Sequence, residues 1–282
     1  MKTVVKSGKV EVTIGAEMPF VIIGEKINPT GNKKLSAALK EGNYSFICDL
    51  AREQVAAGAD ILDVNVGIPG LNEAVVLPEV ARILSETVEV PICLDSVDPE
   101  ALEAALTVLP GRPLVNSVNG EEKCLAAVLP IIKEYQVPVI GLVLDEHGVS
   151  KDAETRTSIA RKIIERAAEF GIPAEDILID PLVLAAGSEE GAGAITLETI
   201  QTVSQTFGAN IILGASNISF GLPDRHTLNQ AFLAMAIGQG ATCAITDPVQ
   251  MAPIIRASDL LAGRDPFARR YITYWRTHKS KE

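Results

Sequence analysis

The sequence predicts one α/β domain over residues 1–282, folded as a (β/α)8 TIM barrel with an N-terminal β-hairpin that closes its bottom. Three observations support this fold. Short runs rich in Val, Ile and Leu alternate with longer segments of helical period, eight such runs fall within about 230 residues, and glycine often follows a helical segment. A (β/α)8 barrel consists of eight strand–helix units and typically has about 250 residues in total.

The eight predicted strands are residues 20–25, 60–66, 91–96, 113–118, 138–144, 176–181, 210–216 and 241–247. Between them, apolar residues recur at three- and four-residue intervals, which is typical of amphipathic helices. A doubly wound open sheet is the alternative, but it usually has fewer strands and a glycine-rich fingerprint after the first one. The corresponding stretch here is "GEKINPTG", which lacks that fingerprint.

The N-terminal extension, residues 1–19, contains "TVVKSGKVEV", two β-rich runs around Ser7-Gly8. This pattern predicts a β-hairpin. We expect it to plug the N-terminal mouth of the barrel, because it precedes the first barrel strand.

The composition excludes several classes of partner. The formal net charge is −11, whereas binding to nucleic acid or an anionic membrane surface requires clustered Lys and Arg. No run approaches the ~18 apolar residues of a membrane span, and the N-terminus lacks the apolar core of a signal peptide. The four scattered cysteines form no C-x-x-C pair, which favours buried thiols in a reducing compartment. We therefore predict a cytoplasmic protein.

Polar side chains end many of the predicted strands. Asp63, Asp95, Asn116 and Asp180 lie within or one step beyond apolar runs, where an unpaired polar group would cost about 1–3 kcal/mol. The carboxyl ends of barrel strands carry the chemistry of barrel enzymes, so we expect these four to face a ligand. Polar residues that cap helices are the alternative. We assign that role to Asp98, Asp152 and Asp247.

The residue types at these strand ends restrict the chemical class of the ligand. Ionised carboxylates accept hydrogen bonds, whereas Asn amides both donate and accept, so the set matches a flat heterocycle with several N–H donors and one carbonyl. A pterin presents such an edge. A phosphate site would need glycine-rich loops and basic groups after the last two strands. We expect no bound metal, because H-x-H and D-x-D spacings are absent.

Seven motifs occur in order along the chain: "IIGEKINPTG", "LDVNVG", "CLDSVDPEALEAAL", "VNSVNGE", "ILIDPLVL", "LGASNISFGLPDR" and "NQAFLAMAIGQGA". Together they resemble the pterin-binding TIM-barrel family, and most closely its methyltetrahydrofolate:corrinoid protein methyltransferases, which are related to dihydropteroate synthase. The resemblance implies transfer of a methyl group between N5 of tetrahydrofolate and the cobalt of a corrinoid (cobalamin) carried by a partner protein. It also implies a homodimer that serves one-carbon, methylotrophic or acetogenic metabolism.

The same resemblance implies roles for individual residues. Asp95, Asn116 and Asp180 would hold the pterin ring, and Asp63 with Asn65 would complete the floor of the site.

Asn217 is the expected catalytic residue, which would face N5 of the pterin. Weaker candidates for substrate contact are Glu25, Asn28, Ser216 and Arg225. For Lys33 and Lys34 we favour solvated surface charge over contact with the acidic folate tail. The sequence "SFGLP" after Asn217 replaces a more polar loop of the family, and the N-terminal hairpin is absent from the acetogenic folate methyltransferases.

Three other functions are alternatives to methyl transfer. A dihydropteroate synthase-like enzyme would need a Ser-Thr-Arg triplet after the second strand and a lysine after the seventh, but "DVNVGIPG" and "LGASNIS" lack both. An aldolase-type lyase would need a Schiff-base lysine at a strand end, and none is present. A non-catalytic folate-binding subunit stays open, as do the direction of transfer, the corrinoid partner and the choice between folate and another tetrahydropterin.

Overall fold

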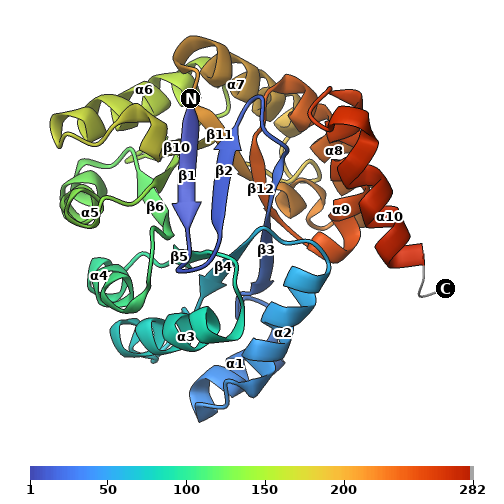
Figure 1. Cartoon of the computed structure of the whole chain (residues 1–282). Helices are drawn as coiled ribbons and strands as arrows, with labels where there is room; N and C mark the ends of the chain where they lie inside the picture. Colours follow the sequence, from blue (N-terminus) through green and yellow to red (C-terminus); the bar gives the residue numbers. More distant parts are fainter. Residues whose placement is uncertain (280–282) are drawn as a thin grey trace.

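The computed structural model describes residues 1–279 and shows a closed barrel of eight parallel strands (Figure 1). Neighbouring strands are consecutive in the chain, and the last pairs with the first. The predicted (β/α)8 barrel is therefore confirmed. The strands are β3 (Val21–Ile27), β4 (Ile61–Asn65), β5 (Ile92–Asp95), β6 (Leu114–Asn119), β7 (Val139–Leu142), β10 (Ile177–Asp180), β11 (Asn210–Gly214) and β12 (Cys243–Thr246).

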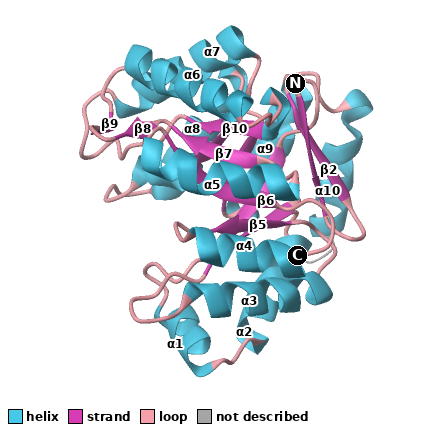
Figure 2. Ribbon diagram, turned by 90° about the vertical axis from the view of Figure 1, so that its left-hand side faces the viewer, coloured by secondary structure: helices cyan, strands magenta, loops and turns pink. Residues whose placement is uncertain are grey.

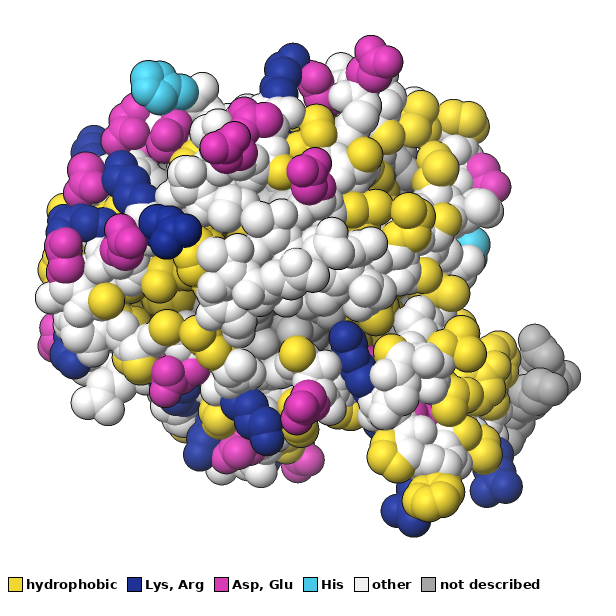
Figure 3. All heavy atoms as spheres, turned by 90° about the horizontal axis from the view of Figure 1, so that it is seen from above, with side chains coloured by type: hydrophobic (Ala, Val, Ile, Leu, Met, Phe, Trp, Pro, Cys, Tyr) yellow, Lys and Arg dark blue, Asp and Glu magenta, His cyan; other side chains and the backbone are white. Residues whose placement is uncertain are grey.

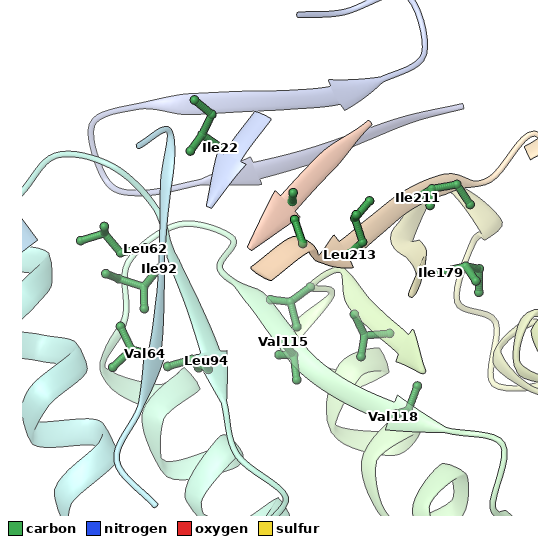
Figure 4. Close-up of a cluster of buried hydrophobic side chains, with 14 of the residues drawn as sticks. Ile22, Leu62, Val64, Ile92, Leu94, Val115, Val118, Ile179, Ile211 and Leu213 are labelled. Carbon is green, nitrogen blue, oxygen red and sulfur yellow. The ribbon is translucent and has the colours of Figure 1, made fainter. Parts of the chain in front are cut away.

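Helices surround the barrel and cover the outer face of its strands. Outward side chains such as Ile22, Leu62 and Val115 form the large apolar cluster beneath them (Figure 4). The helices are α1 (Lys33–Glu41), α2 (Ser45–Ala56), α3 (Glu73–Thr87), α4 (Pro99–Val108), α5 (Glu122–Tyr135), α6 (Ala153–Glu169), α7 (Ala192–Phe207), α8 (Arg225–Gln239), α9 (Pro248–Leu261) and α10 (Arg269–Lys279). Short 3-10 helices are η1 (Ala174–Asp176), η2 (Ala215–Ser219) and η3 (Pro266–Ala268).

A second apolar cluster fills the inside of the barrel. It includes Ile23, Ile61, Cys93 and Leu114, each of which points inward from a different strand. Successive side chains of a strand point to opposite faces. The residues two positions further along these strands therefore also point inward, at the C-terminal end of the barrel.

The N-terminal hairpin plugs the opposite end, as predicted. Strand β1 (Lys2–Lys6) pairs antiparallel with β2 (Glu11–Gly15). Val5 and Ile14 are fully buried in the inner cluster. The Nδ2 atom of Asn210, at the start of β11, donates hydrogen bonds to Thr3 Oγ1 (2.9 Å) and to the Ile14 carbonyl (3.1 Å). These bonds satisfy a buried amide and fix the hairpin to the barrel.

The fifth predicted strand is shorter than expected. Residues 138–144 do not form one strand: β7 ends at Leu142, and β8 (Leu144–Asp145) leaves the barrel to pair with β9 (Gly148–Val149). The apolar run continues past the barrel because Val143 is buried outside it. Asp145 consequently accepts a hydrogen bond from the His147 N–H in this small hairpin.

Three predicted helix caps are confirmed. Asp98, Asp152 and Asp247 accept hydrogen bonds from backbone N–H groups in the first turns of α4, α6 and α9.

All four cysteines are free thiols. Among the helices of residues 1–279, none is both long and apolar enough to cross a membrane.

Candidate active site

A cavity of about 780 Å³ lies at the C-terminal end of the barrel strands. The N-terminal hairpin of β1 and β2 lies at the other end of the barrel (Figure 2). It is lined by seven of the ten residues singled out from the sequence. Those seven come from five strands, β3, β4, β5, β6 and β11, or from the segments that follow them. They are Glu25, Asn28, Asp63, Asp95, Asn116, Ser216 and Asn217.

The floor of the cavity is built by three neighbouring strands. The parallel register places Asn65 of β4 beside Asp95 of β5, and Asp95 beside Asn116 of β6. Asn65 Nδ2 donates to Asp95 Oδ2 at 3.0 Å, and Asn116 Nδ2 donates to Asp63 Oδ1 at 3.3 Å. The Asp95 carboxylate is thus held by an amide of the adjacent strand β4, and the Asp63 carboxylate by an amide of β6, two strands away.

Asn65 is not among the cavity-lining residues. Its Oδ1 accepts from the Gly67 N–H at 2.8 Å, so both ends of its amide are used within the protein. The geometry therefore points to Asn65 as a support for Asp95.

The two floor carboxylates are protonated more readily than ordinary aspartates. Burial raises the pKa of Asp63 well above its usual range, and the negative charge of Asp95 raises it further, although hydrogen bonds from Cys93 and Asn116 oppose the shift. Burial also raises the pKa of Asp95 to about 6, against the hydrogen bond from Asn65. Two nearby carboxylates that are largely removed from solvent do not ionise together easily, so a ligand with N–H donors would stabilise their charged forms.

Asp180 lies at the end of β10 but is not among the cavity-lining residues. It is buried, and its Oδ1 accepts from the Leu182 N–H at 2.8 Å. Burial raises its pKa to about 7, although the positive charge of Arg156 opposes this. Arg156 is fully buried and its Nη1 donates to the carbonyls of Pro181 and Leu182, so it braces the loop after Asp180.

Asn217 lies in η2, directly after β11, and its side chain is exposed to the cavity. Within residues 1–279 its amide makes no hydrogen bond. Gly214 makes room for it, because a Cβ atom at position 214 would lie 3.2 Å from Asn217 Nδ2. An alanine at position 214 would therefore displace the Asn217 amide by a few tenths of an ångström.

Glu25 and Ser216 join β3 to η2 across the cavity. Ser216 Oγ lies 3.1 and 3.0 Å from the two carboxylate oxygens of Glu25, to which it donates. Burial raises the pKa of Glu25, against that hydrogen bond, and Asp247 raises it further. The contact fixes Ser216, the residue before Asn217.

Arg225 does not line the cavity. Its Nη2 donates to the Ser216 carbonyl at 2.8 Å and its Nε to Ser219 Oγ at 3.0 Å. The guanidinium therefore braces η2 from the outer side. Asn28 does line the cavity, and its Oδ1 accepts from the Thr30 N–H in a tight turn.

A bulge in β3 positions Glu25, and the sequence contained no clear signal for it. The pairing of β3 with β4 shifts register between Gly24 and Ile27. The Lys26 N–H instead donates to Gln54 Oε1, at 2.8 Å. Gly24 leaves room for this contact, because a Cβ atom at position 24 would lie 2.5 Å from that oxygen and displace the Gln54 amide. The only sequence feature that indicates this bulge is Gln54, a single amide on the apolar face of α2, and it is a weak indication.

Two further groups lie around the cavity: the pair of Ser96 and Glu73, which the sequence did not predict, and a wall that includes Lys33 and Lys34, which we interpret from the sequence as solvated surface charge. Ser96 Oγ donates to Glu73 Oε2 at 2.6 Å, beside Asp95. Residues 30–34, from the loop after β3 and the start of α1, line one wall of the cavity. The positions of these two groups depend on the conformations of the loops after β3 and β5. The pattern of residues within the strands does not predict those conformations.

Comparison with known proteins identifies relatives that cover most of the chain. The family model described as "Pterin binding enzyme" matches residues 24–247. A methylcorrinoid:tetrahydrofolate methyltransferase of Eubacterium limosum is 33% identical over 268 residues, which are 92% of this chain and 97% of that protein. A methionine synthase of Mycobacterium tuberculosis is 31% identical over 87% of this chain, which corresponds to 22% of that longer protein.

Solved structures share the fold at lower identity. A Yersinia pestis dihydropteroate synthase with a pterine-sulfa conjugate has a TM-score of 0.72 at 17% identity, over 93% of this chain and 99% of that one. A Xanthomonas albilineans dihydropteroate synthase in complex with 7,8-dihydropteroate has a TM-score of 0.67 at 19% identity, over 89% and 95% of the two chains. At these identities the likeness shows the barrel alone. The family model and the Eubacterium limosum relative show more: this chain belongs to the pterin-binding enzyme family.

Proposed function

We propose that this protein is a methyltetrahydrofolate:corrinoid protein methyltransferase. It moves a methyl group between N5 of tetrahydrofolate and the cobalt of a corrinoid carried by a partner protein. The observation that carries this proposal is that Asp95, Asn116 and Asn217 line one cavity at the rim of a barrel. The similarity to a methylcorrinoid:tetrahydrofolate methyltransferase over 92% of the chain supports it.

The floor of the cavity suits the edge of a pterin. Asp95 accepts hydrogen bonds from the exocyclic amine and adjacent N–H groups, and Asn116 contacts the remaining edge. Asp63 supports Asn116, and Asn65 supports Asp95, through the hydrogen bonds described above. Asp180 is the second acceptor for the ring in this proposal. Asp180 reaches the ring when the loop at Leu182 opens toward the cavity.

The methyl transfer needs help at N5. Co(I) attacks the methyl carbon, the C–N5 bond breaks, and its electron pair stays on N5, which takes a proton. Cobalt is oxidised to methyl-Co(III). A neutral tertiary amine is a poor leaving group, so N5 must gain positive charge by the transition state. The Asn217 amide oxygen stabilises this charge, and its lack of other partners leaves it able to turn toward N5.

The corrinoid protein approaches the same end of the barrel. Phe220, three residues after Asn217, is 70% exposed, and the Arg225 guanidinium lies 6.0 Å from its ring centroid. An exposed aromatic next to an arginine is typical of contact surfaces between proteins. The partner therefore covers η2 and closes the cavity during transfer.

A synthase that binds a pterin diphosphate is the weaker candidate, because three carboxylates, Glu25, Asp63 and Asp95, line the cavity. A non-catalytic folate-binding subunit would share the cavity but not the turnover. Assembly as a homodimer is also proposed. Phe267 in η3 and Ile272 in α10 are 86% and 41% exposed. Figure 3 shows a projecting lobe of the surface on which hydrophobic and basic side chains lie side by side.

We further propose that residues 1–282 act as one pterin-binding unit without a metal of its own, in the cytoplasm, where the four free thiols stay reduced.

The proposal is tested with methyltetrahydrofolate and Co(I) cobalamin, by following the cobalt spectrum. Methylcobalamin should form with the wild-type protein and much more slowly with Asn217→Ala. Folate binding without transfer in either direction, even with corrinoid proteins present, would favour the non-catalytic subunit instead.

A further inference from the structure

A second hollow lies between α9 and α10, which pack side by side on the outside of the barrel (Figure 1). Its volume is about 320 Å³, and three of its five lining residues are arginines. They are Arg256 of α9 and Arg269, Arg270, Thr273 and Tyr274 of α10. None of them lines the cavity described above. The hollow is large enough for a small ligand, and its lining is basic.

Arg256 is nearly buried, yet its charge is not paired. Only 7% of its surface is exposed, and its Nη1 atom has no hydrogen-bond partner. Within the part of the chain that the structure describes, its guanidinium forms no ion pair. Burial lowers the pKa of Arg256, against the attraction of Asp60, and the positive charge of Arg270 lowers it further. A buried charge without a partner is costly, and a bound anion would compensate it.

The two nearest carboxylates are engaged by other groups. Asp60 and Asp259 accept hydrogen bonds of 2.9–3.0 Å from backbone N–H groups at the start of β3. Asp259 oxygens also lie 3.5 Å from Arg270 Nη1 and 4.0 Å from Arg264 Nη1, and Asp60 Oδ1 lies 3.9 Å from Arg270 Nη2. These contacts place the arginine cluster near the N-terminal end of the barrel, far from the rim of polar strand ends.

The exposed side of the hollow adds further donors. The Arg269 guanidinium lies 5.7 Å from the ring centroid of Phe267 and, among residues 1–279, forms no ion pair. Asp265 accepts from two N–H groups in the first turn of α10, so a ligand would be held by side chains instead of this backbone. A guanidinium presents a planar fork of donors that fits two oxygens of a phosphate, and the Thr273 hydroxyl supplies another donor.

We propose that the hollow between α9 and α10 is a phosphate-binding site. Arg256, Arg269 and Thr273 hold a phosphate group, which is either inorganic phosphate or part of a small phosphorylated metabolite. A chain with a net charge of −11 repels anions in general, so a local cluster of arginines is needed to bind one. This inference goes beyond methyl transfer and does not depend on it.

The test titrates the protein with inorganic phosphate and, separately, with AMP, in calorimetry at constant ionic strength. Arg269→Ala/Thr273→Ala, which shortens two exposed side chains, should weaken phosphate binding about tenfold. Arg256→Met, which removes the buried charge, should abolish it. Phosphate should raise the Tm of the wild-type protein but not that of Arg256→Met. Tighter binding of AMP than of phosphate would assign the site to a phosphorylated metabolite, and the reverse order to the free ion.

Thr157→Ala/Arg161→Ala is the matched control, because it alters an arginine and a threonine four residues apart on α6, outside the hollow. It should leave phosphate binding unchanged. The site is overturned if the control weakens binding as much as Arg269→Ala/Thr273→Ala, or if that variant binds phosphate like the wild-type protein. It is also overturned if the wild-type protein binds neither compound. The Arg269→Ala/Thr273→Ala variant decides the question even if Arg256→Met does not fold. Methyl transfer without phosphate should be the same in this variant and the wild-type protein, so the proposed function is tested independently.

Discussion

The two ends of the barrel interior differ in polarity and in what closes them. At the N-terminal end, Val5 and Ile14 of the hairpin pack on inward apolar side chains such as Ile23 and Ile61. Two residues further along β3 and β4, the inward positions are Glu25 and Asp63, and the barrel opens into the cavity. One strand therefore serves stability at its start and ligand binding at its end.

The polar end is maintained at an energetic cost. Burial raises the pKa values of Glu25, Asp63, Asp95 and Asp180, which means that the folded chain disfavours their ionised forms. Active sites commonly hold groups that oppose stability in return for binding. Substitutions at the apolar end should therefore change folding, and substitutions at the polar end should change binding and turnover.

The largest expected effect is at the apolar end. Ile14→Ala removes a fully buried side chain and should lower the free energy of unfolding by about 2–5 kcal/mol, because a cavity forms where the hairpin meets the barrel. Chemical denaturation measures this. Ile272→Ala, the same deletion at a 41% exposed position, should cost far less. Equal losses would mean that the hairpin is not part of the core.

The second largest effect is expected at the polar end of the barrel interior, and it concerns the turnover number kcat. Asn217→Ala should lower kcat about 100-fold, in the range found when one transition-state hydrogen-bonding group is removed, with little change in folate affinity. Stopped-flow kinetics and equilibrium binding separate the two quantities. Asn72→Ala, which removes the cap of α3, should spare kcat. Parallel losses of affinity and kcat at position 217 would contradict the role of Asn217.

A smaller effect, on folate affinity, is expected at the floor of the cavity. Asp95→Asn removes a charged acceptor and should weaken folate binding about tenfold or more. Wild-type affinity should rise from about pH 5 to about pH 8, because the pterin N–H groups favour the ionised form of Asp95, whose pKa is about 6. In Asp95→Asn the part of this rise near pH 6 should disappear. A variant with the full wild-type pH profile would exclude Asp95 as the acceptor.

The same pKa shifts predict an opposite trend for the free protein. A carboxyl whose pKa is higher in the folded than in the unfolded chain binds its proton more tightly when folded. The free energy of unfolding should therefore fall as the pH rises from about 4 through the folded pKa values of about 6 for Asp95 and about 7 for Asp180. Denaturation of ligand-free protein across this range provides the measurement, with Asp180→Asn expected to flatten the curve.

The smallest expected effect tests the contact behind Asn217. Gly214→Ala places a Cβ atom 3.2 Å from Asn217 Nδ2, so the amide must shift by a few tenths of an ångström and kcat should fall several-fold. Gly238→Ala is the control, since a Cβ atom there meets no neighbour within 4 Å. A faster Gly214→Ala enzyme would show that Asn217 is not held in its working position by this contact.

The sequence by itself determined the eight-strand barrel and most of its rim. Alternating apolar runs and helical periods specify strands and helices locally, and polar residues at strand ends, such as Asp63, Asp95 and Asn116, must converge once the barrel closes. The hairpin turn at Ser7-Gly8 is equally local. These features could be predicted because each depends on residues close together in the chain.

Only the tertiary structure decided which rim residues line the cavity and which support it. Asn65 and Arg225 turn their polar atoms toward Asp95 and η2, Gln54 fills the gap left by the β3 bulge, and Lys33 and Lys34 reach the cavity from α1. The physical reason is that hydrogen-bond partners come from segments distant in sequence. A pattern within one segment does not reveal which partner lies opposite.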